Sequence, residues 1–517
     1  MAEIKILWAD DEIDLLKPHV LFLQEKGISI TTTNNGRDAI EWVGKDQFDI
    51  VFLDEQMPGI SGLEALNEIK KKYPSQPVVM ITKSEEEYIM EEAIGSKISD
   101  YLIKPVNPNQ ILLAIKKIID KKRLISQKTT STYQMDFGRI GIEIGQANTF
   151  DEWVDVYKKL IYWELELART QDHSMDEILH LQKSDANNSF ARFIRQNYED
   201  WFRKDFKDRP LMSPDIFKHR VMPVADQTER TFFILIDNLR FDQWKVLEPE
   251  VKDLFSVEKE EIFCSILPTA TQYARNAMFA GLMPADIANL YPSMWINDED
   301  DGGKNLFEED LLGKQMTRLG KDVKYKYEKI TNSRAGKKLA ESAANLLNNQ
   351  LSVLVYNFVD MLSHASTDSE LVRELAGDEA AYRSLTLSWF KHSYLYDILV
   401  FAASKKIKVI ITTDHGTIRV DNPVKIVGDR NTTTNLRYKS GKNLNYPNKQ
   451  VYEILKPETA RLPKTNVSTS FVFCQNNDFF AYPNNYNHYV NYYKNTFQHG
   501  GISMEEMLIP FIVLSPK

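Results

Sequence analysis

The sequence predicts an α/β protein built from several domains, and three observations lead to this prediction. The chain has 517 residues, which at ordinary domain sizes corresponds to about three domains. Hydrophobic residues make up 43% of the chain and charged residues 26%, a balance typical of globular proteins that bury sizeable cores. Short apolar runs alternate with amphipathic stretches of helical length in residues 1–122, and strand-like runs recur after residue 230.

The first 122 residues predict a parallel sheet with helices on both faces. Strand-like segments alternate with helical ones, which is the pattern of such a sheet. The strand-like segments are residues 4–9, 29–33, 49–54, 77–82 and 100–104. In a parallel sheet chemistry gathers at the carboxyl ends of the strands.

Those strand ends carry three acids, a hydroxyl and a lysine: Asp10, Asp11, Asp54, Thr82 and Lys104. Adjacent carboxylates plus a third suit a hard divalent ion such as magnesium. A hydroxyl and a lysine can bind a phosphoryl group placed on the third acid. Taken singly, the acid pair is also typical of a turn, and Lys104 followed by proline is typical of a helix stop.

In this order, the five residues resemble the receiver domain of two-component response regulators. The resemblance implies that a sensor histidine kinase phosphorylates Asp54 and that phosphorylation drives homodimer formation. The implied magnesium ligands are Asp10, Asp11, Asp54 and the backbone carbonyl of Gln56. The implied switch residues are Thr82, Tyr101 and Lys104.

A helical connector is predicted next. The helical pattern that starts near residue 107 runs to about 126, and we expect it to break at residues 129–134, TTSTYQ. Capping-box spacing relates Thr149 to Glu152 and Ser174 to Glu177, which predicts helix starts at both places.

Apolar residues in 153–168 follow the helical period and predict one buried face. They are Trp153, Val156, Tyr157, Leu160, Trp163 and Leu167. We interpret residues 123–210 as a small helical bundle whose aromatic side chains belong to its core rather than to a ligand platform. His173 and His180 have no metal partner at useful spacing, so we expect surface or capping positions. No segment has the basic pattern of a DNA-recognition helix.

The C-terminal part repeats one motif: a carboxylate or imidazole placed where an apolar run ends. In LSVLVYNFVDMLSHA, Asp360 and His364 follow such a run and lie one helical turn apart. The complete set is Asp237, Asp360, His364, Asp414, His415 and His499. Nitrogen and carboxylate oxygen are natural zinc ligands, and two such ions close together can clamp the oxygens of a phosphoryl transfer.

The order of these residues resembles the alkaline-phosphatase superfamily across about residues 230–517. Within it, Pro268–Thr271 (PTAT) resembles the Pro-Thr-x-Thr motif of nucleotide pyrophosphatase/phosphodiesterases, which implies that Thr271 is the nucleophile. The resemblance implies one zinc ion held by Asp360, His364 and His499. It implies a second held by Asp237, Asp414 and His415 and bridged by Thr271.

Two residues near Thr271 keep alternative interpretations. Thr269 is the other candidate nucleophile, and its alternative role is a turn or strand-end hydroxyl. The stretch after Thr271 is helix-like and would aim its positive end at a phosphoryl group. Arg275, one turn on, either reaches a phosphate oxygen or forms a surface salt bridge.

Net charge is −9, and residues 1–122 hold 21 acidic against 15 basic side chains, so no global basic field would attract nucleic acid. Residues 425–449 are a local exception, with one acid, Asp429, and six basic residues. The basic residues are Lys425, Arg430, Arg437, Lys439, Lys442 and Lys449, interleaved with Tyr438 and Tyr446. A solvated loop explains this charge equally well.

Several features predict a cytoplasmic protein. Residues 10–14 contribute four carboxylates where a signal peptide needs apolar residues, and no apolar run approaches the ~18 residues of a membrane span. Cys264 and Cys474 lie in strand-like apolar segments and are expected to be buried free thiols in a reducing compartment.

Taken whole, the chain resembles the PglZ-domain response regulators of the PorX type. This implies a flavodoxin-like receiver (1–122), a helical bundle connector (123–210) and an alkaline-phosphatase-like α/β sandwich (211–517). It also implies control of type IX secretion and phosphodiesterase activity on nucleotides.

The leading hypothesis is therefore a phosphorylation-controlled zinc phosphodiesterase acting on linear or cyclic oligonucleotides. Arg275, Arg437 and Lys439 are its candidate substrate contacts, and Tyr438 or Tyr446 would stack on a base. One alternative is an enzyme for phosphomonoesters or sugar phosphates. The other is a scaffold that regulates transcription by binding a transcription factor.

Overall fold

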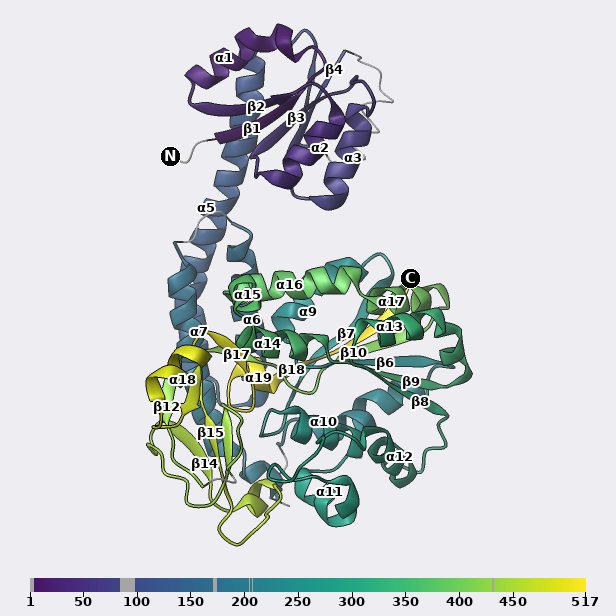
Figure 1. Cartoon of the computed structure of the whole chain (residues 1–517), viewed down its shortest axis with the longest axis vertical. Coiled ribbons are helices and arrows are strands. Elements are labelled where there is room, and N and C mark those ends of the chain that lie inside the picture. Colours follow the sequence, from purple (N-terminus) through teal and green to yellow (C-terminus); the bar gives the residue numbers. More distant parts are fainter. Residues whose placement is uncertain (1–3, 84–97, 171–173, 204, 207, 430–431) are drawn as a thin grey trace. The chain divides into compact units, whose positions relative to one another are not determined.

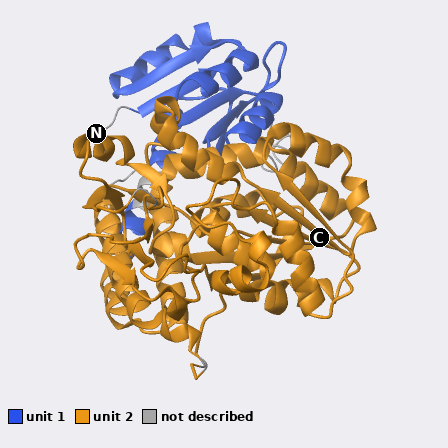
Figure 2. Cartoon of the chain, turned by 60° about the horizontal axis from the view of Figure 1, so that its bottom comes forward, with its two compact units in different colours: residues 1–132, 170–172 blue, residues 133–169, 173–517 orange. Residues whose placement is uncertain are grey.

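The computed structural model describes residues 4–83, 98–170, 174–203, 205–206, 208–429 and 432–517, without the side chains of residues 121–126. The chain divides into two compact units (Figure 2). Unit 1 comprises Met1–Thr132 and Thr170–Asp172, and unit 2 comprises Tyr133–Arg169 and His173–Lys517. His173 and Arg430, for which the sequence analysis made predictions, lie outside the described residues.

Unit 1 contains the predicted parallel sheet. Its strand order, β2-β1-β3-β4-β5, is the flavodoxin-like order, in which strands are added first on one side of β1 and then, from β3 onward, on the other side. The strands are β1 (Ile4–Ala9), β2 (Ile28–Thr33), β3 (Ile50–Asp54), β4 (Val78–Thr82) and β5 (Asp100–Ile103). The described helices before β5 are η1 (Ile13–Leu16), α1 (Lys17–Glu25), α2 (Gly36–Lys45) and α3 (Gly62–Lys72).

Both faces of this sheet are buried, as predicted. Leu7 and Leu53 belong to one hydrophobic cluster, and Trp8 and Phe52 belong to the other. Alternate residues of a strand point to opposite faces, so each strand contributes to both clusters. The carboxyl ends of β1, β3 and β4 therefore form a common edge supported by packing on two sides.

Helix α5 (Pro108–Gln146) runs without interruption for 39 residues. The predicted break at residues 129–134 is wrong. Tyr133 is fully buried, its ring lies 5.4 Å from that of Trp163, and its hydroxyl donates to Gln182 Oε1 at 3.0 Å. Tertiary packing of this kind outweighs the modest helix propensity of threonine and serine.

Two further helices complete the connector: α6 (Phe150–Ala168) and α7 (Asp176–Asn197). The capping box at Thr149 and Glu152 is confirmed, since each side chain accepts a hydrogen bond from the backbone N–H of the other. The second box is wrong. Helix α7 begins at Asp176 with Met175 as N-cap, so Glu177 stands one position too early to complete a box.

The predicted apolar face of α6 is buried, but the core it joins is larger than a bundle. Its six apolar residues belong to the same hydrophobic cluster as the main sheet of unit 2. Tyr157, for example, packs against Phe241, with ring centroids 6.0 Å apart. His180 on α7 is exposed, as expected.

A six-stranded mixed sheet forms the centre of unit 2, in the order β7-β18-β10-β6-β9-β8. Strands β10, β6, β9 and β8 are parallel, β18 runs antiparallel to β10, and β7 runs antiparallel to β18. The strands are β6 (Thr231–Ile236), β7 (Phe255–Cys264), β8 (Tyr325–Ile330), β9 (Leu351–Tyr356), β10 (Lys408–Thr412) and β18 (Leu508–Pro516).

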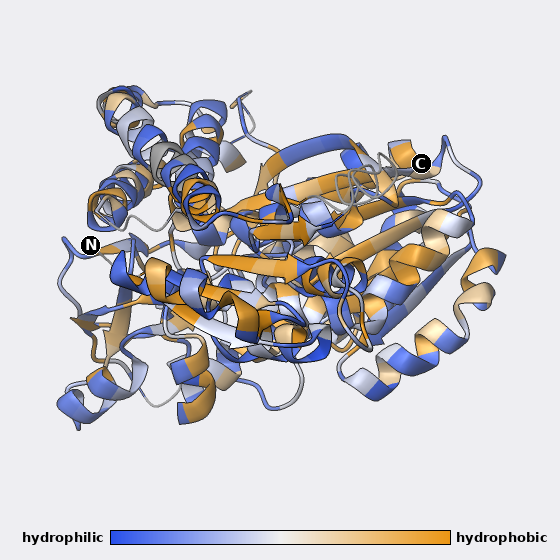
Figure 3. Cartoon of the chain, turned by 90° about the horizontal axis from the view of Figure 1, so that it is seen from above, coloured by the Kyte–Doolittle hydropathy of each residue, from blue (hydrophilic) through white to orange (hydrophobic). Residues whose placement is uncertain are grey.

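Helices cover both faces of this sheet, which confirms the predicted α/β sandwich (Figure 1). One face carries α9 (Phe241–Val251), α13 (Ser333–Glu341), α16 (Glu379–His392) and α17 (Tyr394–Ser404). The other carries α10 (Thr271–Ala280) and α12 (Glu308–Arg318). The sheet strands are predominantly hydrophobic, whereas the surrounding helices are mixed (Figure 3). A sheet buried on both faces requires this pattern.

Residues 416–498 form an excursion from the main sheet. It contains β11 (Ile418–Val420), β12 (Asn422–Lys425), β13 (Tyr438–Gly441), β14 (Val451–Ile454), β15 (Ser470–Cys474), β16 (Asp478–Ala481), α18 (Tyr486–Tyr493) and β17 (Thr496–Gln498). Antiparallel pairing of β11 with β17 sets Ile418 opposite Gln498, so the chain returns to the place it left.

The remaining described helical segments are short. They are η2 (Asp200–Phe202), η3 (Ser213–Asp215), η4 (Phe217–Val221), α8 (Met222–Ala225), α11 (Pro284–Leu290), η5 (Pro292–Met294), η6 (Ala343–Asn348), α14 (Phe358–Asp368), α15 (Glu370–Leu375), η7 (Pro457–Ala460) and α19 (Met504–Met507). Among the described residues, no helix combines the length and apolarity needed to cross a bilayer. Cys264 and Cys474 are buried and free, as predicted.

Candidate functional site

Among the residues that the structure describes, three groups of acidic and histidine side chains have ligand atoms that lie within 4.8 Å of one another. The group in unit 1 is Asp10, Asp11 and Asp54. The groups in unit 2 are Asp237, Asp414 and His415, and Asp360, His364 and His499. These are the three sets that the sequence predicted as metal ligands, and residues up to 178 positions apart in the chain come together within one set.

The site of unit 1 is a buried acidic pair held by a lysine. Asp10 and Asp54 are almost fully buried, and Lys104 Nζ lies 3.0 Å from a carboxylate oxygen of each. Burial raises the pKa of Asp54 to about 6, although the hydrogen bond from Lys104 opposes the rise and the charge of Asp10 adds to it. Such crowding of carboxylate oxygens suits a hard divalent cation.

The other predicted receiver residues surround this pair. Thr82 is buried at the end of β4, and its hydroxyl donates to the carboxylate of Glu55. Tyr101 lies on β5 with 40% of its surface exposed, so its ring is turned outward here. Gln56 is exposed in the loop after β3, two residues beyond Asp54.

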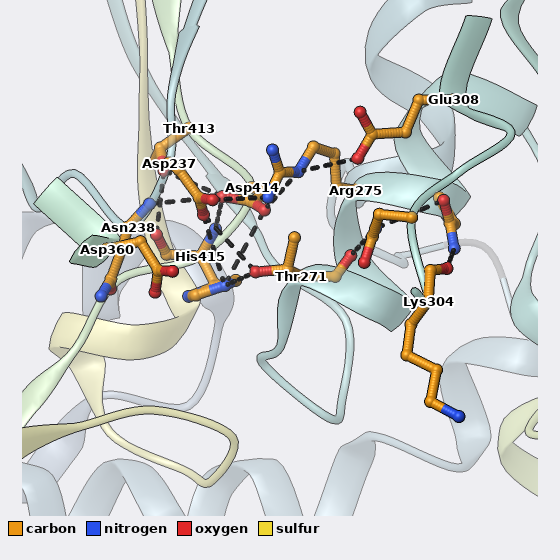
Figure 4. Close-up of polar contacts among 12 residues, drawn as sticks. Asp237, Asn238, Thr271, Arg275, Lys304, Glu308, Asp360, Thr413, Asp414 and His415 are labelled. Carbon is orange, nitrogen blue, oxygen red and sulfur yellow. Dashed lines mark hydrogen bonds and ion pairs between the residues drawn. The ribbon is translucent and has the colours of Figure 1, made fainter. Parts of the chain in front are cut away.

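In unit 2, Thr271 lies at the meeting point of three chain segments. Asp237 directly follows β6, His415 follows β10 by three residues, and Thr271 is the first residue of α10. Thr271 Oγ1 lies 3.0 Å from His415 Nε2 and 3.5 Å from Asp237 Oδ1 (Figure 4). The carboxyl ends of neighbouring parallel strands meet at one edge, which explains this convergence.

The second group of unit 2 adjoins the first. Asp360 and His364 are one turn apart on α14, and Asp360 Oδ1 lies 3.6 Å from Nε2 of both His364 and His499. The rings of His499 and His415 stack with centroids 4.3 Å apart, so the two groups form one continuous site.

Hydrogen bonds fix the tautomers of the two central histidines. His415 Nδ1 lies 3.1 Å from the carbonyl of Gly416, and His499 Nδ1 lies 3.2 Å from the carbonyl of Thr269. A carbonyl only accepts, so each Nδ1 carries a proton and, in the neutral imidazole that binds a metal, each Nε2 presents a lone pair to the site. Metal-ligating histidines are oriented in this way.

The two glycines that follow these histidines have steric reasons to be there. A Cβ on Gly416 would lie 2.0 Å from the carbonyl oxygen of Glu505. Gly500 has φ +123°, a conformation that L side chains rarely adopt, and a Cβ there would lie 2.7 Å from the Tyr438 ring. The DHG and HGG motifs therefore position the histidine ligands through close backbone packing.

Arg275 is buried, so the interpretation as a surface salt bridge is wrong, and its contact with a phosphate oxygen stays a prediction. The side chain is 1% exposed and lies behind the site, with Nη2 2.5 Å from Asp237 Oδ2 and Nε 3.1 Å from Asp414 Oδ2. Glu308 pairs with it from α12 at 3.5 Å (Figure 4). Arg275 is thus a buried counter-charge for two candidate metal ligands.

Burial and neighbouring charges set the protonation of the site. Burial raises the pKa of Asp237 well above its ordinary value, and although Arg275 opposes this, the charges of Asp414 and Asp360 add to it. Burial acts the same way on Asp414, but His415 and Arg275 outweigh it and lower the pKa of Asp414 to about 2. Burial, helped by His415 and His364, lowers the pKa of His499 well below its ordinary value.

The donor set fits zinc. Asp360 Oδ1 is buried and accepts no hydrogen bond, yet it faces the lone pair of His499. Such a grouping of electron-pair donors is repulsive unless a cation lies among them. Nitrogen and carboxylate oxygen are the donors that zinc prefers when no cysteine is present.

Comparison with known families identifies the domains that carry these sites. The family model of the BREX system PglZ alkaline phosphatase-like domain matches residues 216–514, more than half of the chain. The chain belongs to the PglZ family. The PorX response regulator linker domain matches residues 123–202, and the response regulator receiver domain matches residues 6–116. The chain therefore has the architecture of PorX-type response regulators.

Curated relatives match the receiver region. The transcriptional regulatory protein ZraR of Klebsiella oxytoca is 33% identical over 139 residues, which are 27% of this chain and 31% of that protein. ResD of Bacillus subtilis is 28% identical over 130 residues, 25% of this chain and 54% of that protein. The chain thus spans between a third and about half of the length of these relatives.

Solved structures match the same region. The chemotaxis protein CheY4 of Vibrio cholerae aligns at 27% identity over 23% of this chain and 99% of that chain, with a TM-score of 0.22. The family models together show that the chain is a two-component response regulator that carries a PglZ domain of the phosphatase superfamily. Receiver and alkaline phosphatase-like domains generally use divalent metals.

The other threonine of the PTAT motif in the PglZ domain is fully engaged. Thr269 is buried, its hydroxyl donates to the carbonyl of Gly501 at 2.8 Å, and it accepts from the N–H of Gly500 at 3.1 Å. It also supplies the carbonyl that orients His499. Thr269 therefore positions the His499 loop and leaves Thr271 as the hydroxyl facing the ligands.

The predicted substrate contacts in residues 425–449 are wrong. Arg437 is fully buried, with Nη2 2.6 Å from Glu506 Oε2. Lys439 is 1% exposed and donates to the carbonyl of Thr433 at 2.7 Å. Tyr438 is buried with its hydroxyl 3.1 Å from Asp298 Oδ1, and the Tyr446 hydroxyl donates to Glu453. These side chains hold the excursion together instead of facing a substrate.

Some residues that shape the site were not predicted. Thr413 Oγ1 lies 3.3 Å from Asp414 Oδ1 and donates to the carbonyl of His415 at 2.9 Å. Asn238 Nδ2 donates to Ser363 Oγ at 3.1 Å, which links β6 to α14. Their position next to predicted ligands in the sequence was the available signal.

Proposed function

We propose that the PglZ domain is a zinc-dependent phosphodiesterase with Thr271 as its nucleophile, controlled by phosphorylation of the receiver at Asp54. The observation that carries the proposal is the placement of Thr271. Its hydroxyl stands at the N-terminus of α10, 3.0 Å from the unprotonated nitrogen of His415 and beside both ligand groups.

The residues divide into two proposed ligand sets. Asp360, His364 and His499 would hold one zinc ion. Asp237, Asp414, His415 and the Thr271 hydroxyl would hold the other. Zinc bound there would supply Lewis acidity, lowering the pKa of the threonine hydroxyl and neutralising charge on phosphoryl oxygens.

The chain's own groups perform the remaining tasks. Thr271 Oγ1 attacks phosphorus, so that an O–P bond to threonine forms while the P–O bond to the leaving alcohol breaks and the alcohol takes up a proton. Water then cleaves the threonine ester and releases the phosphomonoester. The backbone N–H groups at the start of α10 point toward the phosphoryl oxygens, where a helix N-terminus favours negative charge.

The test compares the two threonines of the motif. Purified full-length protein is expected to carry about two zinc ions per chain, because the two ligand sets make two sites. Thr271→Ala should lower kcat for an oligonucleotide by at least ~100-fold while leaving zinc content unchanged, and Thr271→Ser should retain part of the activity. Absence of zinc, with activity unaffected by Asp414→Ala and His499→Ala, would contradict the assignment.

The same assay separates the competing enzymes. A phosphodiesterase cleaves an oligonucleotide faster than it releases phosphate from a mononucleotide, whereas a phosphomonoesterase shows the reverse order. A scaffold cleaves neither substrate. With Arg437 and Lys439 buried, the preference for linear or cyclic oligonucleotides needs support from another part of the PglZ domain.

Regulation is the second part of the proposal. A phosphoryl group on Asp54, supplied by a histidine kinase with magnesium held at Asp10 and Asp11, would be contacted by Lys104 and Thr82. Tyr101, now exposed, would turn inward, and the altered face would form a homodimer. Light scattering with a small phosphodonor should show mass doubling that Asp54→Ala abolishes. Equal masses under all conditions would refute the coupling.

The PorX-type architecture extends this proposal to type IX secretion control, which a secretion assay of an Asp54→Ala strain tests.

A further inference from the structure

Helix α18 presents a row of aromatic side chains on its outer face. Its inner face, with Tyr486, Val490 and Tyr493, packs against the small hydrophobic cluster of the excursion. The outer face carries His488, Tyr489 and Tyr492, and no residue of the helix is fully buried. The rings of His488 and Tyr492 are close to parallel, at 21°, and Tyr489 is 38% exposed.

This aromatic face lies beside the candidate metal site. The Tyr492 hydroxyl donates to Asp368 Oδ1, 3.4 Å away, and Asp368 stands four residues beyond His364 on α14. Four residues correspond to one helical turn, about 6 Å along the axis. The His364 side chain is 62% exposed, so α18 borders the open side of the site.

The excursion ties α18 to the ligands mechanically. Strand β17 leaves α18 and ends directly before His499, and Gln498 Nε2 donates to Thr367 Oγ1 on α14 at 3.0 Å. Strand β11, which begins three residues after His415, pairs with β17 and contributes to the cluster under α18. The aromatic face is therefore connected to the ligand-bearing segments through β17, β11 and α14.

Cations flank the aromatic rings. The Arg373 guanidinium lies 5.3 Å from the Tyr492 ring centroid, and Lys425 Nζ lies 4.9 Å from that of Tyr486. Lys494 is exposed at the end of the helix. Stackable rings with adjacent basic groups are the combination that binds single-stranded nucleic acid, because every base has a π-face and every linkage has a charge.

We propose that the outer face of α18, formed by His488, Tyr489 and Tyr492, is a nucleobase-stacking platform for the substrate of the PglZ site. The proposal rests on the proposed phosphodiesterase function and names its substrate class, single-stranded oligonucleotides. A base next to the cleaved phosphate stacks on the tyrosines, while Arg373, beside Tyr492, contacts a neighbouring phosphate. The platform thus replaces the buried Arg437 and Lys439 as the source of oligonucleotide preference.

The experiment measures binding separately from turnover. Fluorescence anisotropy of a labelled trinucleotide is recorded with the full-length Thr271→Ala protein in the presence of zinc, and again with an abasic trinucleotide that has the same phosphates. Tyr489→Ala and Tyr492→Ala should each raise Kd for the trinucleotide by about 5- to 100-fold, the effect of losing one stacked base. Neither substitution should change Kd for the abasic probe.

Three controls identify the cause of any loss. Tyr489→Phe and Tyr492→Phe keep the rings and should bind the trinucleotide as the Thr271→Ala protein does. A higher Kd for Tyr492→Phe would instead indicate a role of the Tyr492 hydroxyl. Tyr162→Ala removes an exposed tyrosine on α6 and should have no effect. Unchanged melting temperatures verify that the variants are folded.

The outcomes separate this inference from the proposed function. Equal losses for both probes, or no loss for either, overturn the platform. If the protein with Thr271 intact cleaves oligonucleotides, and Tyr489→Ala and Tyr492→Ala leave KM unchanged, the phosphodiesterase is supported and the platform is rejected. If no diester is cleaved but base-dependent binding persists, the platform stands and the phosphodiesterase falls.

Discussion

Arg275 illustrates how one buried charge can balance a metal site. It is the cation nearest to Asp237 and Asp414 among the described residues, and all three side chains are inaccessible to solvent. Removing one partner of a buried charge group costs about 3–5 kcal/mol, because the other partners stay buried without compensation. Bound zinc would offset part of that loss by replacing the missing charge.

We therefore predict that Arg275→Met lowers the free energy of unfolding by about 3–5 kcal/mol in EDTA and by clearly less in zinc. Urea unfolding under both conditions provides the measurement. Arg220→Met is a matched control, since the Arg220–Glu261 pair is partly exposed and should cost at most about 1 kcal/mol in either buffer. If Arg275→Met lowers the free energy of unfolding equally with and without zinc, Arg275 does not balance the charge of the metal site.

Lys439 gives a pH-dependent prediction. Burial lowers the pKa of Lys439 to about 8, while the unfolded chain keeps the ordinary value of 10.5. Below pH 8 both states are protonated and the folded state carries the full cost of the buried charge. Between pH 8 and 10.5 the unfolded state binds more protons, so stability rises with pH. The free energy of unfolding of the Lys439→Met variant should exceed that of the wild type by about 2–4 kcal/mol at pH 7, and the difference should shrink toward pH 10.5. A pH-independent difference in urea unfolding would show that Lys439 is not buried as an ammonium.

At the scale of elements, the start of α6 is set by Thr149. Its hydroxyl accepts from the N–H of Glu152, and the Glu152 carboxylate accepts from the Thr149 N–H at 3.0 Å. Both bonds satisfy helix donors that have no partner within the helix. Thr149→Ala should lower the free energy of unfolding by about 1 kcal/mol, and Thr149→Ser by much less. Urea unfolding measures both, and equal effects would mean that the methyl group, not the hydroxyl, is what matters.

At the scale of the whole molecule, the connector helices and the PglZ domain form one folding unit. Glu164 on α6 lies 2.5 Å from Arg383 Nη1 of α16 and 2.7 Å from Lys183 Nζ of α7. Burial opposes the charge on Lys183, but Glu164 and Glu505 outweigh it and raise its pKa. The Asn187 amide donates to Glu505 at 2.9 Å, and Glu505 is the residue whose backbone packs on Gly416 beside His415.

A fragment of residues 211–517 should therefore fail to fold cooperatively, because it exposes the apolar and charged surfaces that α6 and α7 cover. A fragment of residues 123–517 should keep a cooperative thermal transition. Differential scanning calorimetry and binding of a hydrophobic dye compare the two fragments. A shorter fragment with the same Tm would show that the connector folds independently of the PglZ domain.

Local pattern was enough to predict much of this protein. The five strands of unit 1, the ligand positions at strand ends and the start of α10 all follow from periodicity and from residues next to one another in the chain. Convergence of the strand ends on one site could be expected because the ends of parallel strands meet at a common edge, whereas the grouping of Asp237 with Asp414 and His415 came from the resemblance to the alkaline-phosphatase superfamily. The glycines after His415 and His499 are equally local signals.

The sequence by itself thus determined the strands, the candidate ligands and their order, and the tertiary structure decided which charges are buried and which surfaces are shared. Arg437 and Lys439 looked like a basic loop because Glu506, the partner that buries Arg437, stands 69 residues away. Helix α5 continues through residues 129–134 because Tyr133 packs on helices that come later in the chain. Burial depends on contacts between distant segments, whereas propensity and spacing depend on neighbours, so pattern predicts elements and ligands but not the environment of each side chain.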